Sequence, residues 1–334
     1  MQTEALPTLD LTELERSPRA LAELDRLCAG TGAFQLTGHG VDPGMRAETL
    51  AQIRAFFALP DAEKQALSRT EANPLGFFDR ELTKNRRDWK QIWDFGPACH
   101  AGPLAGSVPQ FPDRLPAFRV AMERWFAHSH TLAFRVLDVL ARGLGVEPAA
   151  LRRDFGTGDG SFLRLNWYPR CPDPAPHDLP LDAEGSLGIR HHTDSGALTV
   201  LLHDAEPGMQ LLGDGGWRLV EPREDALLVV LGDVVQVWSN DRWRAPLHRV
   251  IAHADRDRYS APFFLNPSYD CTYAPLAPQC GPGRPARYRP IRWSEFRARR
   301  AAGDYADRGE EVQISDWRVV DEGAERLGTT ASLT

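Results

Sequence analysis

Short apolar runs separated by turn-forming residues dominate the sequence after residue 160. Gly, Pro, Asp or Asn stands between most of these runs, and many short strands in succession are typical of a β-sandwich or a β-barrel. The hydrophobic spacing predicts strands at 162–168, 197–203, 209–212, 217–220, 226–231, 234–238, 248–253 and 259–265.

Helical spacing of apolar residues is more common in the first half of the chain. It predicts helices at 19–29 and 43–58, and a shorter helix that begins at Asp61. The longest helical pattern, 115–144, carries a broad apolar stripe and ends at a pair of glycines. A further helix is expected in the carboxy-terminal part, from Ile291.

The order of these elements predicts a mainly β protein with flanking helices. Residues 1–110 form a helix-rich, mixed α/β amino-terminal region, and 111–334 contain the long helix, a strand-rich core at about 160–270 and the carboxy-terminal helix. The Pro- and Gly-rich segment 96–116 is expected to be a linker, and 171–186 a mobile loop close to the functional site.

Composition narrows the class of protein. The 334 residues are 42% hydrophobic, enough for a sizeable core, and the net charge of -7 makes nucleic acid an unexpected partner. No stretch has the length and hydrophobicity of a membrane span or a secretion signal. The five cysteines are odd in number and irregularly spaced, which favours a reducing compartment, so we expect a cytoplasmic protein.

Two histidines and an aspartate have the spacing of a metal site. In a strand, His192 and Asp194 point to the same face while Thr193 points away, so His192, and not its neighbour His191, is the expected ligand. His248 begins a later predicted strand and can supply the third ligand. Two imidazoles and one carboxylate that leave coordination positions open are typical of non-haem Fe(II) oxygenases.

A second group of residues has the chemistry to bind an organic acid. Arg258 and Ser260 share one face of a predicted strand, where a guanidinium and a hydroxyl can together bind a carboxylate. Asn166 and Tyr168 share one face of the strand that ends before Pro169, and both can form hydrogen bonds with such a ligand.

With these elements placed, the chain resembles the isopenicillin N synthase-like branch of the Fe(II)/2-oxoglutarate-dependent dioxygenases. The resemblance covers most of the chain, in the expected order and spacing. It is carried by segments 6–10, 32–40, 56–60, 166–169, 190–194, 208–211, 232–234, 238–240, 248–250, 258–260 and 263–267. It implies that the strand-rich core is a double-stranded β-helix, a form of jelly roll, with the metal at its mouth.

The resemblance also implies a cofactor set and a reaction. His192, Asp194 and His248 would hold Fe(II), Arg258 and Ser260 would bind the distal carboxylate of 2-oxoglutarate beside Tyr168, and Asn166 would support the end nearer the metal. Dioxygen would be the second cosubstrate. Oxidative decarboxylation of 2-oxoglutarate would then drive C–H oxidation of a small-molecule metabolite through an Fe(IV)-oxo species, with hydroxylation as the default outcome and desaturation or cyclisation as alternatives.

The substrate itself is not predicted beyond a small molecule, of the kind found in secondary metabolite biosynthesis. Candidate substrate contacts are Phe78, Arg80, Arg190 and His191. Three alternatives to the main hypothesis stay open. They are an iron oxidase of the isopenicillin N synthase type that does not use 2-oxoglutarate, a non-catalytic binding protein on the same scaffold, and a zinc hydrolase.

Overall fold

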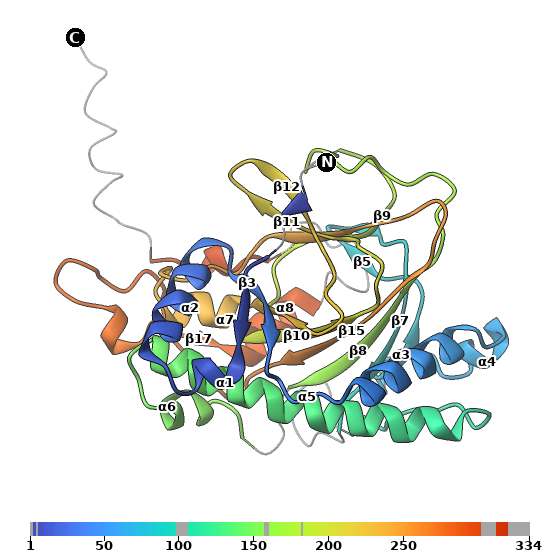
Figure 1. Ribbon diagram of the computed structural model, residues 1–334, viewed down its shortest axis with the longest axis horizontal. Coiled ribbons are helices and arrows are strands. Elements are labelled where there is room, and N and C mark those ends of the chain that lie inside the picture. Colours follow the sequence, from blue (N-terminus) through green and yellow to red (C-terminus); the bar gives the residue numbers. More distant parts are fainter. Residues whose placement is uncertain are drawn as a thin grey trace, which may run out of the picture.

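Two β-sheets lie opposite each other at the centre of the molecule, and helices cover the outside (Figure 1). The computed structural model describes residues 3–4, 6–97, 106–156, 160–181, 183–301 and 312–319. The smaller main sheet has five strands in the order β1-β12-β11-β14-β9, and the larger has eight in the order β2-β3-β13-β10-β15-β8-β7-β4. Two short two-stranded sheets, β5-β6 and β16-β17, lie apart from them.

The strands are short, as the spacing of turn residues predicts. In the first part of the chain they are β1 (Thr3–Glu4), β2 (Thr8–Asp10), β3 (Ala33–Thr37), β4 (Gly76–Phe78), β5 (Leu82–Thr83), β6 (Arg86–Arg87) and β7 (Gln91–Phe95). Later strands are β8 (Phe162–Tyr168), β9 (Leu187–His192), β10 (Leu198–His203), β11 (Met209–Gly213), β12 (Gly216–Val220), β13 (Leu227–Leu231), β14 (His248–Ile251), β15 (Arg258–Leu265), β16 (Thr272–Tyr273) and β17 (Ile291–Arg292).

The helices lie mainly before the strand-rich core. The α-helices are α1 (Leu11–Leu14), α2 (Pro18–Gly30), α3 (Pro43–Phe57), α4 (Asp61–Gln65), α5 (Pro116–Gly143), α6 (Pro148–Arg152), α7 (Asp233–Trp238) and α8 (Trp293–Ala301). The described residues also include the 3-10 helices η2 (Ala277–Gln279) and η4 (Ile314–Trp317). Helices α2 and α3 begin with Pro immediately after a side-chain N-cap, Ser17 and Asp42 respectively, the arrangement that favours a helix start.

Apart from the β11–β12 hairpin, successive strands of the core alternate between the two main sheets. β8, β10, β13 and β15 belong to the larger sheet, and β9, β11, β12 and β14 belong to the smaller one. Each change of sheet carries the chain across the core, so strands distant in sequence become neighbours. This arrangement is consistent with the predicted jelly roll, and the mainly β fold with flanking helices is confirmed.

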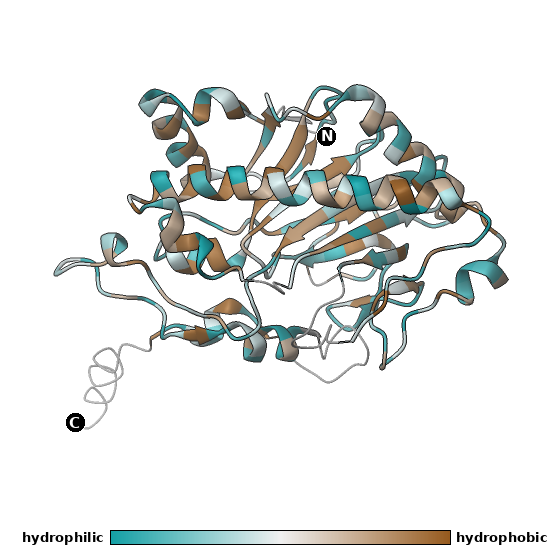
Figure 2. Cartoon of the chain, turned by 90° about the horizontal axis from the view of Figure 1, so that it is seen from below, coloured by the Kyte–Doolittle hydropathy of each residue, from teal (hydrophilic) through white to brown (hydrophobic). Residues whose placement is uncertain are grey.

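Strands of the amino-terminal region extend the same sheets. β3 pairs with β13 at one edge of the larger sheet, and β7 pairs with β8 at the other. Helix α5 crosses the outer face of this sheet, over strands rich in hydrophobic residues (Figure 2). Its buried stripe includes Phe118, Trp125, Leu132 and Leu140, so the predicted apolar face of the long helix is the face that packs.

Two details of the predicted elements are wrong. Residues 234–238, predicted as a strand, belong to helix α7, whose residues are almost all buried. A short apolar run buried on every side has neither a two-residue nor a 3.6-residue period, so the pattern could not distinguish the two. The other detail is β9, which ends at His192, so Asp194 lies beyond the strand that was expected to hold it.

The two predicted connecting segments are described in different measure. The segment at 96–116 lies partly outside the described residues. The loop at 171–186 is held by buried arginines: Arg249 donates to the carbonyl oxygens of His177 and Leu179 at 2.7 and 2.6 Å, and Arg190 donates to two further loop carbonyls. The interaction between this loop and the rest of the protein is therefore extensive.

Candidate metal and cosubstrate site

The two predicted histidine ligands are cross-strand neighbours. His192, the last residue of β9, is paired with His248, the first residue of β14, in the register of the smaller sheet. Directly opposed residues of an antiparallel pair have their side chains within contact distance. The two imidazole centroids lie 4.2 Å apart. Adjacent strands of one sheet therefore bring the two histidines together.

Asp194 reaches the two imidazoles from the loop after β9. Its Oδ1 lies 3.8 Å from Nε2 of His192 and 3.7 Å from Nε2 of His248. Its other oxygen, Oδ2, accepts a 2.5 Å hydrogen bond from the hydroxyl of Thr199 on β10. Thr199 therefore fixes the rotation of the carboxylate and leaves Oδ1 directed toward the histidines.

Hydrogen bonds on the far side of each ring define which nitrogens face Asp194. Nδ1 of His192 lies 2.8 Å from the carbonyl oxygen of Arg190, and Nδ1 of His248 lies 3.0 Å from that of Pro246. Because a carbonyl only accepts, each Nδ1 carries a proton, so Nε2 is the ring nitrogen available to a metal. Burial, and then the neighbouring His248, hold the pKa of His192 well below its usual value, so this ring is neutral at physiological pH.

The predicted carboxylate-binding residues converge through a second strand pair. In the register between β15 and β8, Arg258 lies opposite Tyr168 and Ser260 lies opposite Asn166. The amide of Asn166 donates to the hydroxyl of Ser260 at 3.3 Å. The Arg258 guanidinium is buried, and its carbon lies 5.1 Å from the centre of the Tyr168 ring.

Two polar atoms in this second group have no hydrogen-bond partner. They are Nη1 of Arg258 and Oδ1 of Asn166, and both are buried. A buried polar atom without a partner costs free energy, about 1–3 kcal/mol in typical cases. Such atoms inside a cavity indicate a ligand or ordered water that satisfies them.

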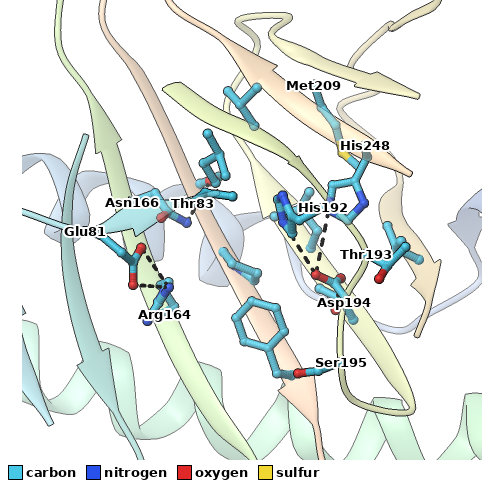
Figure 3. A pocket seen from close by; sticks show the side chains of 18 of the residues that line it. Glu81, Thr83, Arg164, Asn166, His192, Thr193, Asp194, Ser195, Met209 and His248 are labelled. Carbon is cyan, nitrogen blue, oxygen red and sulfur yellow. Dashed lines mark hydrogen bonds and ion pairs between the residues drawn. The ribbon is translucent and has the colours of Figure 1, made fainter. Parts of the chain in front are cut away.

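One cavity of about 170 Å³ contains both groups of residues. His192, Asp194 and His248 lie on one side of it, as Figure 3 shows, and Asn166 lies across from them. Arg258, Ser260 and Tyr168 line the same cavity. The structure thus brings together all seven residues that the sequence predicted for the metal and the cosubstrate.

The wall opposite the histidines is a cluster of buried charges that the sequence analysis missed. Glu81 and Arg164 face the cavity there (Figure 3), and Lys90 also lines it. Nζ of Lys90 lies 2.6 Å from Glu81 and 3.3 Å from Asp88. The cluster consists of three cations, Arg69, Lys90 and Arg164, and three carboxylates, Glu81, Asp88 and Asp94.

The charges of this cluster compensate one another. Arg164 forms a two-fold contact with Asp94 at 2.7 and 2.8 Å and also contacts Glu81. Burial opposes the ionisation of Glu81, but Arg164, Lys90 and Arg69 outweigh it and hold the pKa of this carboxyl well below its usual value. Burial raises the pKa of Asp88 to about 6, against the attraction of Lys90.

Strand periodicity could have identified part of this wall. Phe162, Arg164, Asn166 and Tyr168 alternate along β8, and all four line the cavity. Extending the face of Asn166 and Tyr168 back along the strand would have included Arg164. No such pattern leads to Glu81 and Lys90, because their position depends on how the amino-terminal strands join the sheet.

The four predicted substrate contacts do not line this cavity in the described part of the chain. Phe78 packs against the guanidinium of Arg69 at 3.8 Å, and Arg80 is largely exposed beside Asp79. Arg190 is directed to the loop at 171–186, and His191 is likewise not among the lining residues.

A register shift in β9 accounts for the orientation of Arg190. Val250 pairs with Ile189 and His248 pairs with His192, so two residues of β9, Arg190 and His191, lie opposite the single residue Arg249 of β14. An extra residue of this kind is a β-bulge, and it shifts the alternation of side chains. As a result Ile189 and His192 both line the cavity, although simple alternation places them on opposite faces.

Comparison with known proteins identifies the class to which this fold and site belong. The model of the 2OG-Fe(II) oxygenase superfamily matches residues 160–267, and the model of the amino-terminal region of non-haem dioxygenases in morphine synthesis matches 6–117. Together they span the strand-rich core and the amino-terminal region.

Individual relatives give the same result over most of the chain. Jasmonate-induced oxygenase 4 of Arabidopsis thaliana is 30% identical over 300 residues, which are 88% of this chain and 81% of the relative. Gibberellin 20 oxidase 2 of Oryza sativa subsp. indica is 32% identical over 83% of this chain and 69% of the relative. The crystal structure of JOX2 with 2OG, Fe and JA is similar, with a TM-score of 0.80, 27% identity and coverage of 96% of this chain and 90% of that one.

The chain belongs to the 2OG-Fe(II) oxygenase superfamily. It is an enzyme that couples the oxidative decarboxylation of 2-oxoglutarate to the oxidation of a small metabolite, and Fe(II), 2-oxoglutarate and O2 are its cofactors. The isopenicillin N synthase-type oxidase and the non-catalytic binding protein are not favoured. In the described residues, no helix has the length and apolar character needed to span a bilayer.

Proposed function

We propose that His192, Asp194 and His248 hold the Fe(II) through two Nε2 atoms and Oδ1. The donor set supports this assignment. The three side chains place their ligand atoms within 4.8 Å of one another, and the carbonyl contacts of the two Nδ1 atoms leave Nε2 of each ring free to coordinate a cation. Two neutral nitrogens and one anionic oxygen suit Fe(II) and leave positions open for other ligands.

We further propose that 2-oxoglutarate binds between this centre and Arg258. The unpartnered Nη1 of Arg258 and the hydroxyl of Ser260 are suited to its distal carboxylate, with Tyr168 beside it. Asn166, held by Ser260, supports the end nearer the metal. When bound, Fe(II) supplies the activation of O2, and the protein supplies the position of the cosubstrate and the exclusion of water.

The substrate, in this proposal, occupies the part of the cavity between the metal and the charged wall. Glu81, Lys90 and Arg164 form its polar side. Phe162 and Phe264 form an apolar side, with their rings stacked at 4.8 Å. These residues replace the four contacts predicted from sequence as the candidates for substrate recognition.

The proposed reaction is the hydroxylation of a small molecule, with desaturation or cyclisation as alternative outcomes. A role in secondary metabolite biosynthesis is supported by the relatives named for oxidation of gibberellins and flavanones. A reducing, cytoplasmic location is supported by the four described cysteines, all of which are free.

The observation that carries the assignment is the convergence of Nε2 of His192, Nε2 of His248 and Oδ1 of Asp194 within 4.8 Å of one another. The test is to load the protein with Fe(II) without oxygen, add 2-oxoglutarate and a panel of metabolites, and admit O2. We expect succinate release that depends on 2-oxoglutarate and is stimulated by some panel members, with the product identified by mass spectrometry. O2 consumption without 2-oxoglutarate would indicate the oxidase, and turnover with Zn(II) alone the hydrolase.

A further inference from the structure

The loop at 193–196, which carries Asp194, lies outside the hydrogen-bond ladder of β9 and is held from two other elements. The carbonyl oxygen of Asp194 accepts from the backbone N–H of Asp233 at 2.8 Å, and that of Gly196 accepts from Val234 at 3.1 Å. Both donors belong to helix α7. The carbonyl oxygen of Thr193 accepts instead from a side chain, Nη2 of Arg300 on helix α8, at 2.9 Å.

The α7 contacts leave little room for this loop to move toward the core. A Cβ placed on Gly196 would lie 2.2 Å from Oδ1 of Asn266, and one placed on Gly232 would lie 2.1 Å from the carbonyl oxygen of Gly196. Glycine is therefore required at both positions by close backbone approach. At Thr193, the end of the loop nearest His192, the backbone carbonyl is held by the side chain of Arg300.

The guanidinium of Arg300 links helix α8 to the loop at 193–196 and to residues 312–313. Besides Thr193, its guanidinium donates through Nη1 to the carbonyl oxygen of Val312 at 3.0 Å and to Oε1 of Gln313 at 3.4 Å. The residue is 9% exposed. The helix that carries it is anchored by Phe296, whose ring packs edge-on against Trp317 at 5.3 Å. The fixed fork of the guanidinium matches carbonyls that lie in different directions, which an ammonium cannot do with the same rigidity.

We propose that Arg300 is a positioning residue of the metal centre, and this inference rests on the proposed function of His192 and Asp194 as ligands. Thr193 is the one residue between these two ligands in the chain. Its peptide group therefore determines how far apart, and at what angle, the two ligand side chains leave the backbone. By holding the Thr193 carbonyl, Arg300 sets the geometry of the metal centre from the carboxy-terminal part of the chain without touching the metal.

The test compares Arg300→Met and Arg300→Lys with Arg299→Met. Arg299 is the matched control because it lies next to Arg300 on α8, is half exposed and contacts Glu295 at 3.8 Å, so its loss removes the same charge from the same helix. The probe is Co(II) alone, added to the full-length protein without iron. Calorimetry gives its affinity, the visible absorption band reports its coordination geometry, and thermal unfolding of the metal-free proteins reports the fold.

We expect Arg300→Met to weaken Co(II) binding about tenfold, as the loss of one charge-assisted hydrogen bond predicts, and to alter the absorption band. Arg300→Lys keeps the charge and should fall between Arg300→Met and the unsubstituted protein, which Arg299→Met should match. Unchanged affinity and band in both Arg300 variants would overturn the proposal, as would an equal loss in Arg299→Met. Failure of the unsubstituted protein to bind Co(II) would instead overturn the metal centre itself, and the role of Arg300 with it.

Discussion

The two ends of the cavity differ in how their polar groups are partnered. At the metal end, Nε2 of His192, Nε2 of His248 and Oδ1 of Asp194 face one another and all are acceptors. At the opposite wall, Glu81 and Lys90 belong to a cluster of three cations and three carboxylates that lie in contact with their counter-charges. The ligand atoms at the metal end need a cation as their partner, whereas the charges of the opposite wall are balanced within the protein.

The metal end is therefore expected to bind a ligand, whereas the opposite wall is expected to determine the shape of the cavity. Facing acceptors raise the free energy of the metal-free protein, so removing one of them should cost little stability although it removes the function. Buried ion pairs are balanced only while every partner is present, so the removal of one partner leaves an uncompensated buried charge. Substitutions at the two ends should therefore have opposite effects on stability and activity.

The largest effect is expected at the metal end. Asp194→Ala and His192→Ala should abolish 2-oxoglutarate-dependent succinate release, because each removes one of three ligands. The metal-free variants should unfold within a few degrees of the unsubstituted protein. Activity and thermal unfolding are measured together, with His128→Ala on helix α5, away from the cavity, as the histidine control. Full turnover in either ligand variant under ordinary iron supply would contradict the assignment.

Glu81→Gln should have the converse effect on stability. This substitution removes a carboxylate that faces Lys90 and Arg164, so we expect a loss of about 3–5 kcal/mol in the free energy of unfolding. The control is Glu63→Gln, whose partner Arg114 is exposed and whose pair should contribute at most about 1 kcal/mol. Denaturant unfolding measures both. Equal losses in the two variants would show that the wall is no more than a set of ordinary surface pairs.

Arg258→Ala tests the cosubstrate end. Loss of one charge-assisted contact costs about 1.5–3 kcal/mol, so the KM for 2-oxoglutarate should rise roughly ten- to 150-fold while the iron requirement is unchanged. Arg256→Ala is the matched control, because Arg256 is two residues away and pairs at the surface with Asp255 and Glu206. An unchanged dependence on 2-oxoglutarate in Arg258→Ala would favour the oxidase hypothesis.

The sequence predicted the metal and cosubstrate ends better than the opposite wall because their residues follow local patterns. Arg258 and Ser260 alternate along one strand, and the antiparallel register then places them opposite Tyr168 and Asn166. The spacing of His192 and Asp194 was a correct guide to their proximity, although Asp194 lies after the strand. The register that pairs His192 with His248 could not be obtained from spacing alone.

The remaining features depend on tertiary structure. Glu81 and Lys90 reach the cavity because β7 pairs with β8 across the sheet, and no local pattern encodes that pairing. The β-bulge in β9 depends on its neighbour β14, so alternation alone could not place the side chains that precede His192. Because helix α7 is buried on almost every side, its residues show neither period, and only the tertiary structure decides between a helix and a strand there.

The smallest expected effect concerns the pH dependence of the charged wall. Burial raises the pKa of Asp88 from 3.8 to about 6, so between these values the folded protein binds a proton more tightly than the unfolded chain does. The free energy of unfolding therefore falls as pH rises through this window, by about 1 kcal/mol between pH 5 and pH 7.5 on account of this group.

Asp88→Asn lacks the titration, while its amide oxygen can still accept from Thr83, which donates to Asp88 at 2.8 Å. The free energy of unfolding of the unsubstituted protein, minus that of Asp88→Asn, should accordingly fall by about 1 kcal/mol between pH 5 and pH 7.5. Carboxyls outside the charged wall titrate equally in both proteins, so a difference that is independent of pH would show that Asp88 is ionised throughout, and that the wall compensates it as fully as it does Glu81.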